Sequence, residues 1–179
     1  MKNKLLKNIN WLFCYKIIRV LGGLFITVWV ARYLGPNDFG VLNYSIAYIA
    51  MFMIFSKLGL DQIVVREIAK DKESIDEILG TVFLLKLFGG IFALCCVFIS
   101  FFFIDADFLT RSIIIILSIQ FVFQSLDIID YYYQAQVLSK NVVIARSTAF
   151  ILCSALKIFL IINNFSVIFF AAIIAFDFL

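Results

Sequence analysis

The chain has 179 residues, of which 64% are hydrophobic and 22 are phenylalanine. Soluble domains are only about 45–50% apolar, so the composition excludes an ordinary soluble domain and predicts a polytopic membrane protein. The net charge at pH 7 is only +3, and the chain has no histidine, the commonest general base and metal ligand.

The N-terminal segment predicts a retained helix rather than a signal peptide. Residues 1–8 are basic and residues 9–33 form an apolar run, as in a secretory signal. That run exceeds the roughly 7–15 apolar residues of a signal peptide and lacks a small-x-small cleavage site. Lys16 and Arg19 also interrupt it. We therefore expect this segment to remain as the first helix.

A short polar junction, ARYLGPNDFG, separates the first apolar run from the second and holds the only proline of the chain. Arg32 suits the negative end of an incoming helix. Gly35 suits the left-handed conformation that ends a helix, and Pro36 prevents its continuation. Asn37 or Asp38 offers a side-chain oxygen to cap the next helix. The junction predicts a tight hairpin of two helices.

Apolar runs near the roughly 20 residues that a spanning helix needs occur six times along the chain. They cover residues 9–33, 39–58, 79–103, 109–131, 142–162 and 165–179. The predicted fold class is all-α, a polytopic transmembrane helix bundle of about six spans that forms a single lobe over residues 1–179. The sixth run is short and lacks a polar flank, so we expect a fragment of a longer protein.

The most polar segment, REIAKDKESIDE at residues 66–77, lies between the second and third runs. A short amphipathic helix is one interpretation of its isoleucine spacing, and a solvated loop is the one we favour. Lysine and arginine concentrate on the side that holds the N-terminus, which the positive-inside rule assigns to the cytoplasm. The cations on or near that side are Lys2, Lys4, Lys7, Lys57, Arg66, Lys70, Lys72 and Lys140.

Charges inside the apolar runs are the best candidates for function, because lysine or arginine at the centre of a membrane helix costs about 2.5–3.5 kcal/mol. Arg19 lies too deep to reach the headgroups easily, so we expect it to face a cavity. For Lys16 and Lys86, snorkelling toward the interface and facing the cavity are equally consistent with the sequence. Lys157 lies on the outer side, against the charge bias. Together Arg19, Lys86, Lys157 and Lys16 predict a cationic cavity suited to a phosphate-bearing ligand.

A polar stripe marks the fourth run, where Gln120, Gln124 and Asp127 follow one another at i, i+4 and i+7. It has two interpretations: hydrogen bonding between helices, or the lining of a cavity in which it neutralises Arg19 or Lys86. Arg146 near the inner end of the fifth run is interpreted as an interfacial anchor. In the third run, Gly89 and Gly90 predict close approach of another helix.

No catalytic constellation is visible, because the chain has no Ser-His pair, no HExxH and no GxxxxGK. Cys14, Cys95, Cys96 and Cys153 lie in apolar runs without CxxC spacing, and we interpret them as core or lipid-facing residues. We therefore predict a protein that is not an enzyme and has no cofactor, metal site or nucleic-acid partner.

Several motifs carry a family resemblance: ARYLGPNDFG, the following LNYSIAYI, the later GLDQIVVREIA and the early Asn10-Trp11-Leu12. Together they resemble the opening of the polysaccharide-biosynthesis membrane proteins. These are the O-antigen (Wzx-type) flippases and repeat-unit exporters of the multidrug/oligosaccharidyl-lipid/polysaccharide exporter superfamily. The resemblance implies the N-terminal lobe of a twelve-helix exporter, whose missing C-terminal helices would be its partner.

The resemblance also implies a substrate, an undecaprenyl-diphosphate-linked oligosaccharide such as an O-antigen repeat unit for lipopolysaccharide biosynthesis. Alternating access would carry it across the bacterial cytoplasmic membrane, with the lipid tail in the bilayer and the diphosphate and sugars in the cavity. Three alternatives stay open. They are an inactive N-terminal fragment, a drug or cation antiporter of the same superfamily with Asp127 as its weak carboxylate candidate, and, least favoured, a membrane polymerase.

Overall fold

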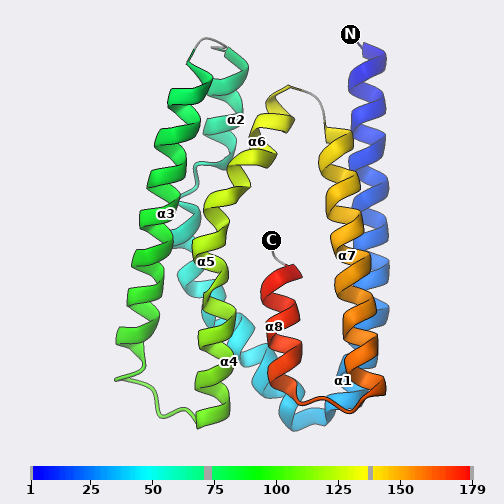
Figure 1. Cartoon of the computed structure of the whole chain (residues 1–179), viewed down its shortest axis with the longest axis vertical. Coiled ribbons are helices and arrows are strands. Elements are labelled where there is room, and N and C mark those ends of the chain that lie inside the picture. The colour runs from blue at the N-terminus through cyan, green and yellow to red at the C-terminus, as the bar shows by residue number, and fades with distance from the viewer. Residues whose placement is uncertain (1, 71–73, 137–138, 178–179) are drawn as a thin grey trace.

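The computed structural model describes residues 2–70, 74–136 and 139–177, without the side chains of residues 2–12, 14–15 and 139–141. Asn10-Trp11-Leu12, Cys14, Lys140 and the end of the sixth predicted run thus lie outside the described side chains. Over the described ranges the regular elements are all helical and pack side by side (Figure 1), which confirms the all-α class. They are α1 (Lys2–Lys57), α2 (Asp61–Lys70), α3 (Ile75–Ser100), α4 (Phe108–Ser118), α5 (Gln120–Phe123), the 3-10 helix η1 (Gln124–Asp127), α6 (Ile128–Ala135), α7 (Ser139–Ile162) and α8 (Val167–Asp177).

Four helical stretches are long and apolar enough to cross a membrane: Lys16–Lys70, Ile75–Ser100, Phe108–Ala135 and Val142–Ile162. Large apolar side chains project outward from them; Phe25, Ile54 and Phe88 are 77%, 72% and 66% exposed. Extended apolar surface of this kind suits lipid rather than water. The chain is therefore a membrane protein with several apolar helices, of which α8 is shorter than the others.

The bend in α1 lies at Gly35, where the junction predicted a hairpin. Gly35 has φ 72° and ψ 177°, so the positive φ is as predicted, but the backbone adopts the extended glycine-only region rather than the left-handed helical one. Pro36 then lies in the first turn of the second arm. A proline is tolerated there, because the N–H groups of a first turn have no acceptor within the helix. Figure 1 shows the first arm running down from the N-terminus and the second rising again toward α2.

The loop favoured for residues 66–77 is wrong at both ends, because Asp61–Lys70 forms the helix α2 and residues 75–77 begin α3. Val64 and Ile68 are buried one turn apart and pack in a cluster with Ile128 and Tyr131 of α6. Residues 71–73 lie outside the described residues. The turn before α2 has two successive positive φ values, 53° at Leu58 and 64° at Gly59. The helix forms because its apolar stripe has a surface to cover.

The fourth predicted run, residues 109–131, lies within one helical stretch, Phe108–Ala135, as expected, but this stretch is divided into four successive elements. A turn at Ile119 separates α4 from α5, and the chain then tightens into η1 before α6. The break falls on the polar stripe, since Gln124 and Asp127 are the first and last residues of η1. A mid-helix stretch of 3-10 helix often marks a functional or strained position.

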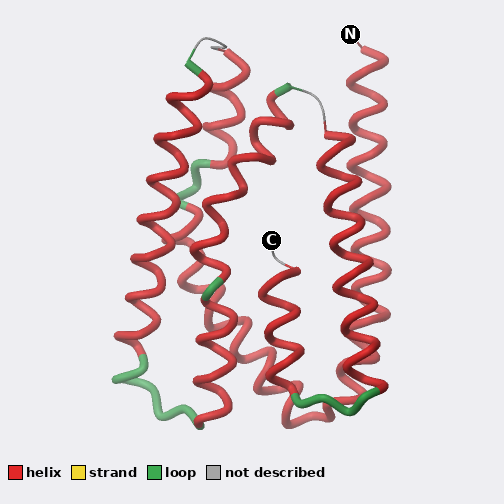
Figure 2. The backbone as a smooth tube through the Cα atoms, viewed as in Figure 1, coloured by secondary structure: helices red, strands yellow, loops and turns green. Residues whose placement is uncertain are grey.

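Glycine allows α3 to pack closely between two neighbours, as Gly89-Gly90 predicted. A Cβ atom on Gly90 would lie 2.3 Å from the carbonyl oxygen of Phe121, and one on Gly89 would lie 2.6 Å from that of Phe55. Ser56 on the second arm of α1 donates a hydrogen bond to the same Phe121 oxygen at 2.9 Å, which stabilises the packing of α1 against α5. Figure 2 shows the loops after α3 and α7 at the end of the bundle opposite the N-terminus. The second arm of α1, α3 and α5 thus form a tightly packed unit.

Candidate functional site

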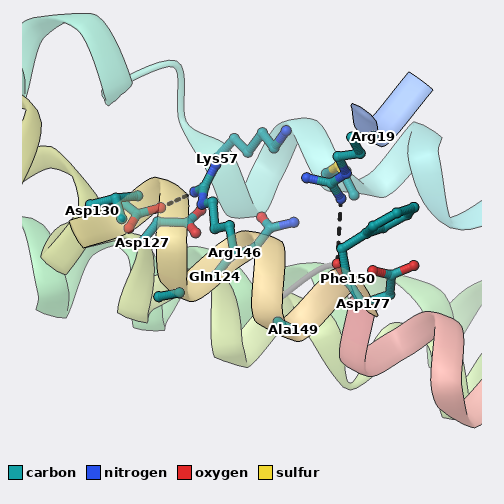
Figure 3. A pocket seen from close by; sticks show the side chains of 12 residues that line it. Arg19, Lys57, Gln124, Asp127, Asp130, Arg146, Ala149, Phe150 and Asp177 are labelled. Atoms are coloured by element: carbon teal, nitrogen blue, oxygen red, sulfur yellow. Dashed lines mark hydrogen bonds and ion pairs between the residues drawn. The ribbon is translucent and has the colours of Figure 1, made fainter. Parts of the chain in front are cut away.

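A cavity of about 510 Å³ lies between α1, η1, α6, α7 and the C-terminal end of α8 (Figure 3). We call it the charged cavity, because six of its lining residues are ionisable. Three are cations and three are acids: Arg19, Lys57, Arg146, Asp127, Asp130 and Asp177. Its volume falls in the roughly 300–1,000 Å³ range of ligand sites.

Two groups of polar contacts bound the charged cavity, as the dashed lines in Figure 3 show. Toward α6, the guanidinium of Arg146 forms an ion pair with the carboxylate of Asp130. Toward α8, Arg19 Nη2 donates to the backbone oxygen of Asp177 at 3.4 Å, and Lys157 Nζ pairs with the Asp177 carboxylate at 2.6 Å. Arg146 of α7 is thus paired with an acid of α6, whereas Arg19 of α1 contacts the backbone at the end of α8.

A second, less polar cavity of about 260 Å³ adjoins the first. Arg19, Phe150 and Asp177 line both cavities and form the boundary between them. Lys157 lines the second cavity and not the first. Of the predicted cations, Arg19 and Lys157 are therefore brought together, with Asp177 as the residue they share.

The polar stripe of the fourth run lies beside the charged cavity. Gln120, Gln124, Asp127 and Asp130 line a cavity of about 210 Å³, which we call the stripe cavity. Gln124, Asp127 and Asp130 line the charged cavity as well, so the two spaces adjoin. Gln124 and Asp127 of the stripe thus line the same cavity as Arg19.

Lys86 is not brought together with Arg19. Its side chain is completely buried, and its ammonium donates to Asp61 Oδ1 at 2.9 Å and to Tyr131 Oη at 2.5 Å. Tyr131 in turn donates to the same carboxylate oxygen at 2.5 Å. Lys86 therefore joins α3 to α2 and α6 and does not line the charged cavity. Lys16 is exposed on α1 and does not line it either.

Sequence reasoning missed several cavity residues. Arg146, interpreted as an interfacial anchor, lines the charged cavity and pairs with Asp130. Lys57 was assigned to the inner side and Asp177 was left without a role, yet both line the same space. The expected cationic excess is also wrong for this cavity, because its three cations face three acids. The aspartates of the fourth run were the one feature of the sequence that indicated acids in this cavity.

Across the described ranges, no group of three His, Cys, Asp or Glu residues lies close enough to hold a metal ion. Cys95, Cys96 and Cys153 are free thiols.

Apolar helices suited to lipid, packed around a cavity with charged walls, define an integral membrane protein with a polar interior. Residues 5–177 match the family described as polysaccharide biosynthesis protein. The chain therefore belongs to this family of exporters, which includes the Wzx-type proteins. Neither the curated proteins nor the solved structures contain a significant match to the chain.

Proposed function

We propose that this chain is the N-terminal lobe of an exporter that moves an undecaprenyl-diphosphate-linked oligosaccharide across the bacterial cytoplasmic membrane by alternating access. Family membership supports the class of substrate. In this proposal the N-terminus is cytoplasmic and the chain crosses the membrane six times, the two arms of α1 and the short α8 each counting as one crossing. A second lobe would complete the path.

The observation that carries the proposal is the convergence of Arg19, Lys57 and Arg146 on the charged cavity. Arginine binds phosphate through a planar fork, and lysine acts as a compact charge. A diphosphate carries more negative charge than the single carboxylate of Asp130 or Asp177, so it can compete for the same cations. Asp130 would then hold Arg146 in the empty cavity and release it when substrate enters.

Binding and transport test the proposal separately. The chain in nanodiscs is titrated with undecaprenyl diphosphate, and binding is followed by native mass spectrometry. We expect Arg19→Gln combined with Arg146→Gln to weaken binding at least about tenfold, because each lost hydrogen bond to a charged group is worth about 1.5–3 kcal/mol. The matched control is Arg66→Gln, whose side chain is 72% exposed on α2. Equal binding by the double variant and the wild type would refute the cationic site.

Translocation of a fluorescent undecaprenyl-diphosphate-linked sugar in proteoliposomes then separates two interpretations. Translocation above protein-free liposomes supports an active flippase. Binding without translocation supports the alternative that this lobe is inactive by itself.

A drug or cation antiporter is the second candidate, and the acids that balance the cavity cations favour it. Asp127 lines both the charged cavity and the stripe cavity. For an antiporter we expect ethidium to bind and Asp127→Asn to abolish that binding. Ethidium that neither binds nor displaces undecaprenyl diphosphate would exclude this candidate.

A further inference from the structure

The two glutamines of the polar stripe are buried without hydrogen-bond partners. Gln120 is 2% exposed and Gln124 is 8% exposed. Among the described residues, nothing pairs with Gln120 Nε2, Gln120 Oε1 or Gln124 Oε1. Both side chains line the stripe cavity, and Figure 3 shows Gln124 among the side chains that surround the charged cavity. The stripe therefore places unpaired donors and acceptors beside the stripe cavity, a hollow whose lining also includes the exposed side chains of Phe123, Leu126 and Ile129.

This arrangement does not fit hydrogen bonding between helices, the other interpretation of the stripe. A buried amide without a partner is unfavourable, since it has lost its bonds to water and gained none in return. Two such amides one helical turn apart, bordering a cavity, point to a ligand that completes their bonds. Apolar replacements would pack at these positions without that penalty.

The chemistry of the free groups selects the ligand. A metal cation would use the two Oε1 atoms and the Asp127 carboxylate and would leave Gln120 Nε2 unpaired. A phosphate would accept from Nε2 but face acceptor oxygens elsewhere. A hydroxyl group both donates and accepts, so neighbouring hydroxyls satisfy amide nitrogen, amide oxygen and carboxylate together. Phe123 adds an apolar wall to the stripe cavity, as ligand pockets with a few placed polar groups usually have.

We propose that Gln120, Gln124 and Asp127 form a subsite for the hydroxyl groups of a sugar, namely the first sugar of the lipid-linked oligosaccharide. This inference rests on the proposed function. The subsite shares Gln124, Asp127 and Asp130 with the charged cavity. A sugar bound along the stripe therefore lies next to the cations that would hold its diphosphate, in the order in which the two groups are linked.

Two lipid probes test the subsite: undecaprenyl diphosphate carrying one N-acetylglucosamine, and undecaprenyl diphosphate without sugar. The variant is Gln120→Met combined with Gln124→Met, which removes the amides and keeps the length of the side chains. The control is Gln134→Met, at an exposed position of α6. We expect the double variant to bind the sugar-bearing probe at least about fivefold more weakly, as for the loss of two neutral hydrogen bonds. Its affinity for the sugarless probe should fall less, because Gln120 lines the stripe cavity and not the charged cavity.

Thermal unfolding separates a ligand site from a structural role. If the glutamines have no partner in the ligand-free protein, the double methionine variant unfolds at a higher temperature than the wild type, because unpaired polar groups have been replaced by apolar ones. A lower unfolding temperature would show that they hold helices together and would overturn the subsite. Equal binding of both probes by the wild type would overturn it too, with the proposed function intact. Binding of neither probe would refute the proposed function and the subsite together.

Discussion

Replacing Asp61 with asparagine is expected to destabilise the protein more than removing the lysine that Asp61 neutralises. Lys86 is completely buried, whereas the Asp61 side chain is 43% exposed. Asp61→Asn therefore leaves an ammonium in the interior with a weaker partner. Lys86→Met leaves a carboxylate that water reaches and that still accepts the hydrogen bond of Tyr131.

The magnitude follows from this difference in exposure. Breaking a fully buried ion pair by removing one partner costs about 3–5 kcal/mol. Water around Asp61 screens part of the interaction, and Tyr131 still accepts from the ammonium, so we expect Asp61→Asn to lower the free energy of unfolding by about 2 kcal/mol. Lys86→Met should cost less than about 1 kcal/mol, because it replaces the charge with an apolar chain of similar length.

The assay is equilibrium unfolding of the purified chain in mixed micelles by increasing denaturing detergent, followed by tryptophan fluorescence. The double variant Asp61→Asn/Lys86→Met completes a thermodynamic cycle and should be about as stable as Lys86→Met alone. Additive effects of the two changes, or a larger loss for Lys86→Met than for Asp61→Asn, would refute the idea that Lys86 depends on Asp61.

Two glycine substitutions test the packing in the same assay. Gly90→Ala should cost about 1–3 kcal/mol by overpacking, because its Cβ would lie 2.3 Å from the backbone oxygen of Phe121. Gly80→Ala, with nothing within 4 Å of its Cβ, is the control and should gain up to about 1 kcal/mol of helix propensity; equal effects would contradict the close approach. Gly35→Ala should cost about 1–3 kcal/mol through strain alone, since its Cβ also meets nothing within 4 Å but its φ is +72°. No loss of stability in that variant would show that the bend can form without a glycine conformation.

Local chemistry predicted the local features of this fold. The positive φ of Gly35 and the tight packing at Gly90 both follow from what a residue without Cβ permits. The helix α2 could have been predicted as well, because Val64 and Ile68 lie four residues apart on one helix face. The break at Gln124 could not, since residues 108–135 contain neither glycine nor proline. It depends on how the fourth run packs against its neighbours.

The partners of the buried charges depend on which helices become neighbours, and hydropathy does not show this. Lys86 and Arg19 look alike in sequence, as cations within apolar runs. In the fold, Lys86 forms an ion pair with Asp61, whereas Arg19 donates a hydrogen bond to the backbone oxygen of Asp177. Lys86, Asp61 and Tyr131 contact one another and line neither the charged cavity nor the stripe cavity, so their role is to join helices.

Pairing also changes the mechanism expected of the charged cavity. A lone arginine in a membrane is costly, and a carboxylate placed beside it reduces that cost while the site is empty. Arg146 has Asp130 for this purpose and Lys157 has Asp177. An anionic ligand must then displace a carboxylate from its cation. The affinity therefore reflects the difference in free energy between the cation–ligand pair and the cation–carboxylate pair. Removing an acid should therefore increase the affinity for undecaprenyl diphosphate while destabilising the empty protein, which is the opposite of the effect of removing an arginine.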